Sequence, residues 1–131
     1  MIRLLNHFFR YQFPAVLWAG FIYWISSIPS HRLPKFAHLF NDKIAHAGTF
    51  FVLGLLIYRA IGPEHPSKAV RWQRLVMAVI AVVIYGFFDE FHQGFVAGRS
   101  VDVLDAIADA VGGLLAAIVI LALSRRKHLE A

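Results

Sequence analysis

The chain has 131 residues, of which 59% are hydrophobic and only 16% are charged. Soluble domains average about half apolar and a quarter charged residues, so this composition favours an integral membrane protein. The chain has no cysteine, which excludes disulfide bonds, thiolate catalysis and thiolate metal sites. The net charge of +5 comes from basic residues that flank apolar segments rather than forming one patch, so we expect no nucleic-acid partner.

Four segments are predicted to be membrane-spanning helices, each of which needs about 20 largely apolar residues. In chain order they cover about residues 11–28, 42–61, 72–91 and 101–123. The first follows basic residues, as a signal peptide does, but Trp18 and Trp24 replace the small residues of a cleavage site. We therefore interpret it as a retained helix. The short connections and the lack of repeats predict one domain over residues 1–131, an all-α four-helix transmembrane bundle.

Basic residues are distributed unequally between the two ends of these spans. The side of the termini and the second connection carries Arg3, Arg10, Arg59, Lys68, Arg71, Arg74, Arg125, Arg126 and Lys127. The other side carries Arg32, Lys35, Lys43 and Arg99. Because positive residues favour the cytoplasm, we predict that both termini are cytoplasmic and that the first and third connections face outward.

Acidic residues gather at the predicted outer ends of the second, third and fourth spans. They are Asp42, Asp89, Glu90, Asp102, Asp105 and Asp109. Asp102, Asp105 and Asp109 follow the spacing of one helical stripe, which descends about two turns into the membrane. An ionised Asp at a bilayer centre costs roughly 2.5–3.5 kcal/mol on insertion scales. Asp109 is therefore expected to face the bundle interior, a water-filled cleft or a partner charge.

Basic side chains near the same helix ends are expected to pair with these carboxylates. Arg99 is the first candidate, because a guanidinium binds a carboxylate or a phosphate through two parallel hydrogen bonds, and Lys43 is the second. His46 lies one turn after Asp42 and shares its helix face. Closely spaced carboxylates cannot all ionise in a site of low dielectric constant, so at least one should hold a proton, bind a cation or pair with a histidinium.

Taken together, these motifs resemble the VanZ-like family of bacterial membrane proteins. They are Asp42-Lys43-x-x-His46, Asp89-Glu90-x-x-Gln93 and Gly98-Arg99-Ser100-x-Asp102-x-x-Asp105, followed by Gly112. The similarity extends from about Ser26 to Leu123 and departs from the family at Asp109, where Asn is usual. The resemblance implies a multi-pass protein of the bacterial cytoplasmic membrane with a role in the cell envelope, because the founding member is linked to resistance to the glycopeptide antibiotic teicoplanin.

Three functions are open for the acidic cluster. A hydrolase or transferase would act on a lipid-linked or other envelope substrate. A binding or accessory protein would hold an envelope precursor or a glycopeptide without changing it. A transporter would use the acidic stripe as a relay for protons or cations. Against transport, residues 114–123 in the inner half of the fourth span are uniformly apolar.

For the enzyme, residue types predict roles. The acid–base candidates are His46, Asp89, Glu90 and Asp105. The candidates for substrate binding are Lys43, Gln93, Arg99, Asp102 and Asp109. Asp102 is equally well placed to cap the fourth helix. A divalent cation is a further candidate partner, with Asp42, His46, Glu90 and His92 as ligands, although no recognised zinc motif is present. The expected partners are membrane lipids and a lipid-linked envelope precursor, and the oligomeric state is open.

Overall fold

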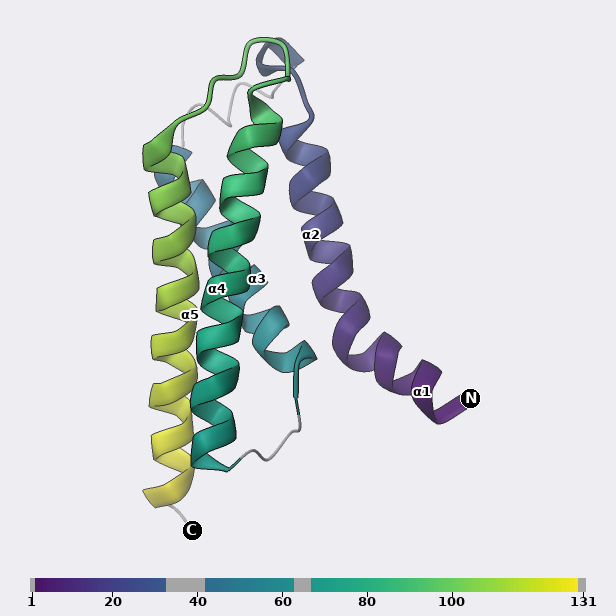
Figure 1. The fold of residues 1–131 in the computed structure, drawn as a ribbon, viewed down its shortest axis with the longest axis vertical. Helices are drawn as coiled ribbons and strands as arrows, with labels where there is room; N and C mark the ends of the chain where they lie inside the picture. The colour runs from purple at the N-terminus through teal and green to yellow at the C-terminus, as the bar shows by residue number, and fades with distance from the viewer. Residues whose placement is uncertain (1, 33–41, 63–66, 130–131) are drawn as a thin grey trace.

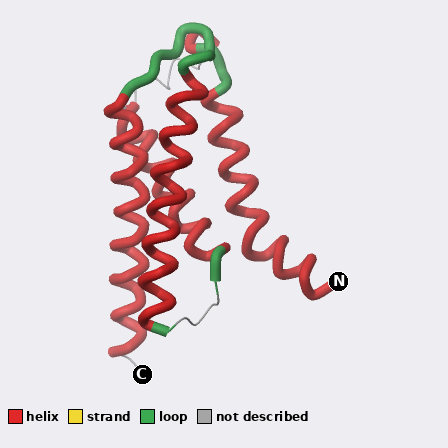
Figure 2. Tube along the Cα trace, in the orientation of Figure 1, coloured by secondary structure: helices red, strands yellow, loops and turns green. Residues whose placement is uncertain are grey.

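The computed structural model describes residues 2–32, 42–62 and 67–129, and within these ranges the chain forms helices and turns without a strand (Figure 2). The helices are α1 (Ile2–His7), the π-helical turn η1 (Phe8–Gln12), α2 (Phe13–Ser26), the 3-10 turn η2 (Ser30–Arg32), α3 (Asp42–Ala60), α4 (Lys68–Gln93) and α5 (Val103–Leu129). The prediction of an all-α chain is confirmed for these residues.

The N-terminal helix is longer than predicted and irregular in the turn before Pro14. Elements α1, η1 and α2 follow one another without a gap, whereas the sequence predicted a helix from about residue 11. Proline has no N–H group for the regular helical hydrogen bond. Just before it, the Phe13 N–H donates to the Phe8 carbonyl oxygen, the five-residue spacing of a π turn. The wider turn thus accommodates the proline within a helix that continues on both sides of it.

Helices α3, α4 and α5 pack against one another, and α2 packs against α3 and α4 (Figure 1). The closest approach, between α3 and α5, depends on small residues. A Cβ atom added at Gly112 would collide with the Ala47 carbonyl oxygen, and one added at Gly54 would lie 3.0 Å from the Ala116 Cβ. Toward the N-terminus, α2 diverges from α4 and α5 (Figure 1), whereas η1 stays in contact with α3.

Two helices are long and apolar enough to cross a membrane, namely Lys68–Gln93 and Val103–Arg125. They correspond to the predicted third and fourth spans and leave large apolar side chains such as Phe87 (63% exposed) and Ile118 (59%) on the surface. The helices at the first two predicted spans are not both long enough and apolar enough to meet the same criterion. The regular part of the first has 14 residues, and α3 carries charged residues at both ends.

The four-span bundle with cytoplasmic termini therefore stays a prediction. Of the basic residues used for that topology, Lys35 lies outside the described residues, as do the side chains of Arg3, Arg126 and Lys127. The described chain does place at one end of the molecule the helix ends that flank the predicted outward connections. The C-terminal ends of α2 and α4 meet the N-terminal ends of α3 and α5 there, at the top of Figure 1.

The connection between α4 and α5 docks on η2, the turn that follows α2, through a glycine. Gly98 has a φ angle of +74°, which favours glycine, and a Cβ atom added there would collide with the Ser30 hydroxyl oxygen. Beside this contact, the Ser30 N–H donates a hydrogen bond to the Ala97 carbonyl oxygen at 3.3 Å. The docked connection brings residues 98–102 over the ends of the helices, where the predicted site residues lie.

Candidate functional site

Asp102 begins α5 and connects it to two other helices. Its Oδ1 accepts a hydrogen bond from the Leu104 N–H at 2.8 Å, and its carbonyl oxygen accepts one from the Asp105 N–H at 3.0 Å. Asp102 is therefore the N-cap of α5, which confirms one of its two predicted roles. Its own N–H donates to the Glu90 Oε2 at 2.8 Å, so a carboxyl group of α4 holds the start of α5.

Lys43 of α3 bridges two carboxylates of α5. Its Nζ donates hydrogen bonds to the Asp102 Oδ2 and the Asp105 Oδ1. Asp102 precedes the apolar helix and is partly exposed, and the hydrogen bond from Lys43 lowers the pKa of its carboxyl group below the ordinary value. Asp105 is buried, so Lys43 supplies the positive charge that this carboxylate needs away from water.

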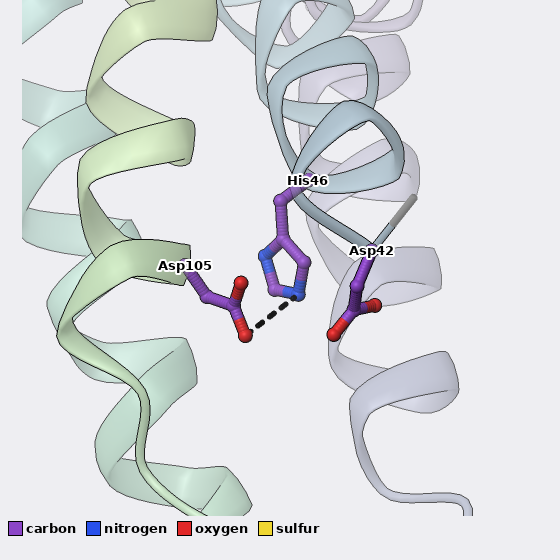
Figure 3. A group of neighbouring side chains, drawn as sticks. All are labelled: Asp42, His46 and Asp105. Carbon is purple, nitrogen blue, oxygen red and sulfur yellow. Dashed lines mark ion pairs between the residues drawn. The ribbon is translucent and has the colours of Figure 1, made fainter. Parts of the chain in front are cut away.

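His46 occupies the centre of the cluster and contacts a carboxyl group through each side of its ring. Its Nδ1 lies 2.9 Å from the Oδ1 of Asp109, which has no exposed surface. Its Nε2 lies 3.9 Å from the Asp105 Oδ2 (Figure 3). Asp42, one turn earlier on α3, lies on the other side of the same nitrogen (Figure 3). The histidine thus connects the deepest carboxylate to those nearer the helix ends.

The expectation that Arg99 is the main partner of the carboxylates is wrong. Its guanidinium donates instead to the carbonyl oxygens of Ile28 at 3.3 Å and Ile25 at 3.5 Å. The last carbonyl groups of a helix have no partner within it, so the end of α2 competes with the carboxylates for these donors. Lys43 and His46 take the role predicted for Arg99.

Among the other polar residues of α4, Asp89 and Gln93 pair with each other, whereas His92 faces α2. Asp89 is buried, and its Oδ2 accepts a hydrogen bond from the Gln93 Nε2 at 2.8 Å. His92 turns toward α2, where its ring stacks on that of Tyr23 at 4.4 Å and its Nε2 lies 2.9 Å from the Ser27 hydroxyl oxygen. His92 therefore lies apart from the carboxylates with which it was predicted to hold a metal ion.

Two groups among the described residues have ligand atoms close enough together to hold a metal ion. One contains Asp42, His46 and Asp105, and the other contains His46, Glu90 and Asp109. In each group the ligand atoms lie within 4.8 Å of one another. His46 belongs to both, and His92 belongs to neither.

A cavity of about 650 Å³ opens beside this cluster. Its polar wall includes Asp42, His46, Asp89, Gln93, Arg99, Asp102 and Asp105. Its apolar wall includes Ile22 and Ile25 of α2 and Phe50 of α3. Sequence reasoning missed the contribution of the N-terminal helix and the turn after it, which includes Ser26 of α2 and Ser30 of η2. The run of polar residues at the end of the first predicted span was the available signal.

Gly86 of α4 was also missed, although it makes room for the deepest carboxylate. A Cβ atom added there would lie 2.9 Å from both the Cβ and the Oδ2 of Asp109. Only a helix without a side chain at this position can approach Asp109 so closely. Nothing in the apolar run around Gly86 indicates this contact, because it depends on how α4 and α5 face each other.

Comparison with known proteins gives one match. The model of the VanZ/LLP1 family matches residues 5–124, from α1 through most of α5. The matched region includes every residue of the cluster and of the cavity described above. No curated protein and no solved structure matches the chain.

Proposed function

This chain belongs to the VanZ/LLP1 family, and we propose that it is a multi-pass protein of the bacterial cytoplasmic membrane that hydrolyses or transfers a group of a lipid-linked envelope substrate. The apolar helices α4 and α5 support the membrane location. The excess of basic residues at the termini and the second connection supports cytoplasmic termini. In this orientation the cavity opens toward the outer leaflet, where lipid-linked precursors of the envelope are used.

The observation that carries the proposal is the two-sided cavity. A lipid-linked substrate joins a polar group to an apolar chain, and the cavity offers carboxylates, His46 and Arg99 on one wall and Ile22, Ile25 and Phe50 on another. Binding sites for small molecules commonly have volumes of about 300–1,000 Å³ and combine apolar walls with a few polar groups. The cavity suits the polar end of such a substrate and the first part of its chain.

Asp105 is the residue that we assign as the general base. It lines the cavity although it is 5% exposed, so it can meet a bound substrate while most of its surface is shielded from water. Lys43 holds its Oδ1, and its Oδ2 lies toward His46 (Figure 3). A base must lie within hydrogen-bond reach of the proton that it removes. Asp105 would take this proton from a water molecule or a substrate hydroxyl group, and Arg99 would lie close to an anionic group of the substrate.

The experiment that tests the proposal searches for the substrate. Wild-type protein and Asp105→Asn are purified in detergent, incubated with a total extract of envelope lipids, and the lipids are analysed by mass spectrometry. A lipid that is chemically changed by the wild type alone supports an enzyme and identifies its substrate. A lipid retained by both proteins but changed by neither supports a binding protein instead. Absence of any changed or retained lipid contradicts both functions.

A further inference from the structure

Glu90 and Asp109 lie deeper than the cavity wall, and together with His46 of that wall they form a group of ligands to which the proposed reaction assigns no step. It consists of His46 of α3, Glu90 of α4 and Asp109 of α5, whose ligand atoms lie within 4.8 Å of one another. Glu90 is 3% exposed and Asp109 has no exposed surface. Three helices thus each contribute one ionisable side chain, and the two carboxyl groups among them are shielded from bulk water.

Each of the two carboxyl groups leaves one oxygen atom unsatisfied. The Glu90 Oε2 accepts the Asp102 N–H, whereas its Oε1 is buried and has no hydrogen-bond partner within the described part of the chain. The Asp109 Oδ1 faces the His46 Nδ1, whereas its Oδ2 is buried and likewise lacks a partner there. An unpaired buried oxygen of this kind costs about 1–3 kcal/mol, and more when the group is charged. Because the two oxygens belong to neighbouring carboxyl groups, one bound cation could satisfy both.

The unsatisfied oxygen of Asp109 faces the helix that carries Glu90. Asp109 Oδ2 rests against Gly86, as shown by the 2.9 Å distance to a Cβ atom added at that position. Glu90 follows Gly86 by four residues and therefore lies on the same face of α4, one turn nearer the cavity. His46 approaches from α3 and reaches Asp109 with its Nδ1. The three side chains converge on one point between α3, α4 and α5.

We propose that His46, Glu90 and Asp109 bind one divalent transition-metal cation of the Zn²⁺ or Mn²⁺ type. One imidazole and two carboxylates suit these ions, whereas Ca²⁺ and Mg²⁺ prefer oxygen ligands alone. Two ligand atoms at about 2.0–2.2 Å from a tetrahedral ion are roughly 3.4 Å apart, so a spread of 4.8 Å closes with small side-chain rotations. The ion would neutralise both carboxylates and pair their unsatisfied oxygens.

The surrounding contacts fit this assignment better than they fit the other group. A metal-binding histidine usually donates its second ring N–H to a carboxylate, and the Asp105 Oδ2, at 3.9 Å from the Nε2 of His46, needs only a small side-chain rotation to accept that hydrogen bond. In the alternative group, Asp42 is exposed and Asp105 already pairs with Lys43. Three protein ligands also leave one of four positions open, and His46 borders the cavity from which a water or substrate atom could reach it.

The test measures metal binding directly and needs no substrate. The protein is purified in detergent with a tag that contains no histidine and is stripped with a chelator. It is then titrated separately with Zn²⁺ by calorimetry and with Mn²⁺ by electron paramagnetic resonance. We expect about one ion per chain for the wild type and an affinity at least about tenfold lower for Asp109→Asn and Glu90→Gln. The matched control Asp42→Asn, which alters only the other group, should keep the wild-type affinity.

Two results would overturn the proposal. The first is a wild-type protein that binds neither ion, which would show that protons satisfy the two carboxyl groups. The second is loss of binding in Asp42→Asn together with unchanged binding in Glu90→Gln, which would place the ion in the other group. Glu90→Gln gives the answer if Asp109→Asn fails to fold. Since no turnover is measured, a metal-binding protein that changes no lipid would refute the proposed enzyme and leave the metal site intact.

Discussion

Replacing Gly86 with alanine should separate α4 from Asp109. The added Cβ would lie 2.9 Å from the Cβ and the Oδ2 of Asp109, closer than carbon and oxygen atoms pack. Overpacking of this kind costs about 1–3 kcal/mol, whereas Gly→Ala in a helix gains up to about 1 kcal/mol. We therefore expect Gly86→Ala to lower the free energy of unfolding by about 0–3 kcal/mol relative to the wild type, and to be about 1–3 kcal/mol less stable than a helical Gly→Ala variant without a collision.

The matched control is Gly20→Ala in α2, because a Cβ atom added at Gly20 meets nothing within 4 Å. This variant should keep or raise stability by up to about 1 kcal/mol, since it gains helix propensity without a collision. Thermal unfolding of both variants in the same detergent, followed by circular dichroism at the helix band, compares them. If Gly86→Ala is as stable as Gly20→Ala, Asp109 does not pack against α4 and the geometry of the deep site is wrong.

Three further predictions concern the contacts within the cluster. His46→Ala should destabilise the fold by about 3–5 kcal/mol because it leaves Asp109 buried without its partner, and this loss should shrink in the double variant with Asp109→Asn, as a double-mutant cycle on thermal unfolding would show. Asp102→Ala should cost about 0.5–2 kcal/mol through the lost N-cap of α5, whereas Asp102→Ser should restore most of this cap; equal losses in the two variants would contradict the capping role. Because Lys43 lowers the pKa of Asp102 in the folded state, the stability from this pair is present at neutral pH and is lost as the pH falls below about 4, so Asp102→Asn should flatten the acid side of the stability profile relative to the wild type.

Hydropathy alone was sufficient to predict the helical class and the apolar helices α4 and α5. Each contains a long run without a charged residue, over residues 75–88 of α4 and 110–123 of α5. The first helix was harder, because the residues before Tyr11 are a mixture of charged and aromatic types and Pro14 argues against a continuous helix. The π turn allows the helix to continue through Pro14, but such a local change in hydrogen bonding cannot be predicted from an apolar pattern.

The gathering of carboxylates at one end was also predictable, because helical spacing decides which residues share a face. Their partners were not, since spacing within one helix says nothing about how neighbouring helices are rotated. Arg99 illustrates this limit: its charge suits a carboxylate, but the carbonyl groups at the end of α2 lie in its reach. Gly86 illustrates it too, because its importance comes entirely from the carboxylate of another helix.

The most direct test of the proposed function compares turnover in two variants at the same end of the molecule. Asp105→Asn keeps the shape of the side chain but removes the proton acceptor, and His92→Gln changes a residue that contacts α2 instead of the carboxylates. With the lipid identified by mass spectrometry, we expect kcat to fall by about 10²–10⁴-fold in Asp105→Asn and to stay near the wild-type value in His92→Gln. Equal kcat values for the wild type and Asp105→Asn would contradict catalysis by this cavity.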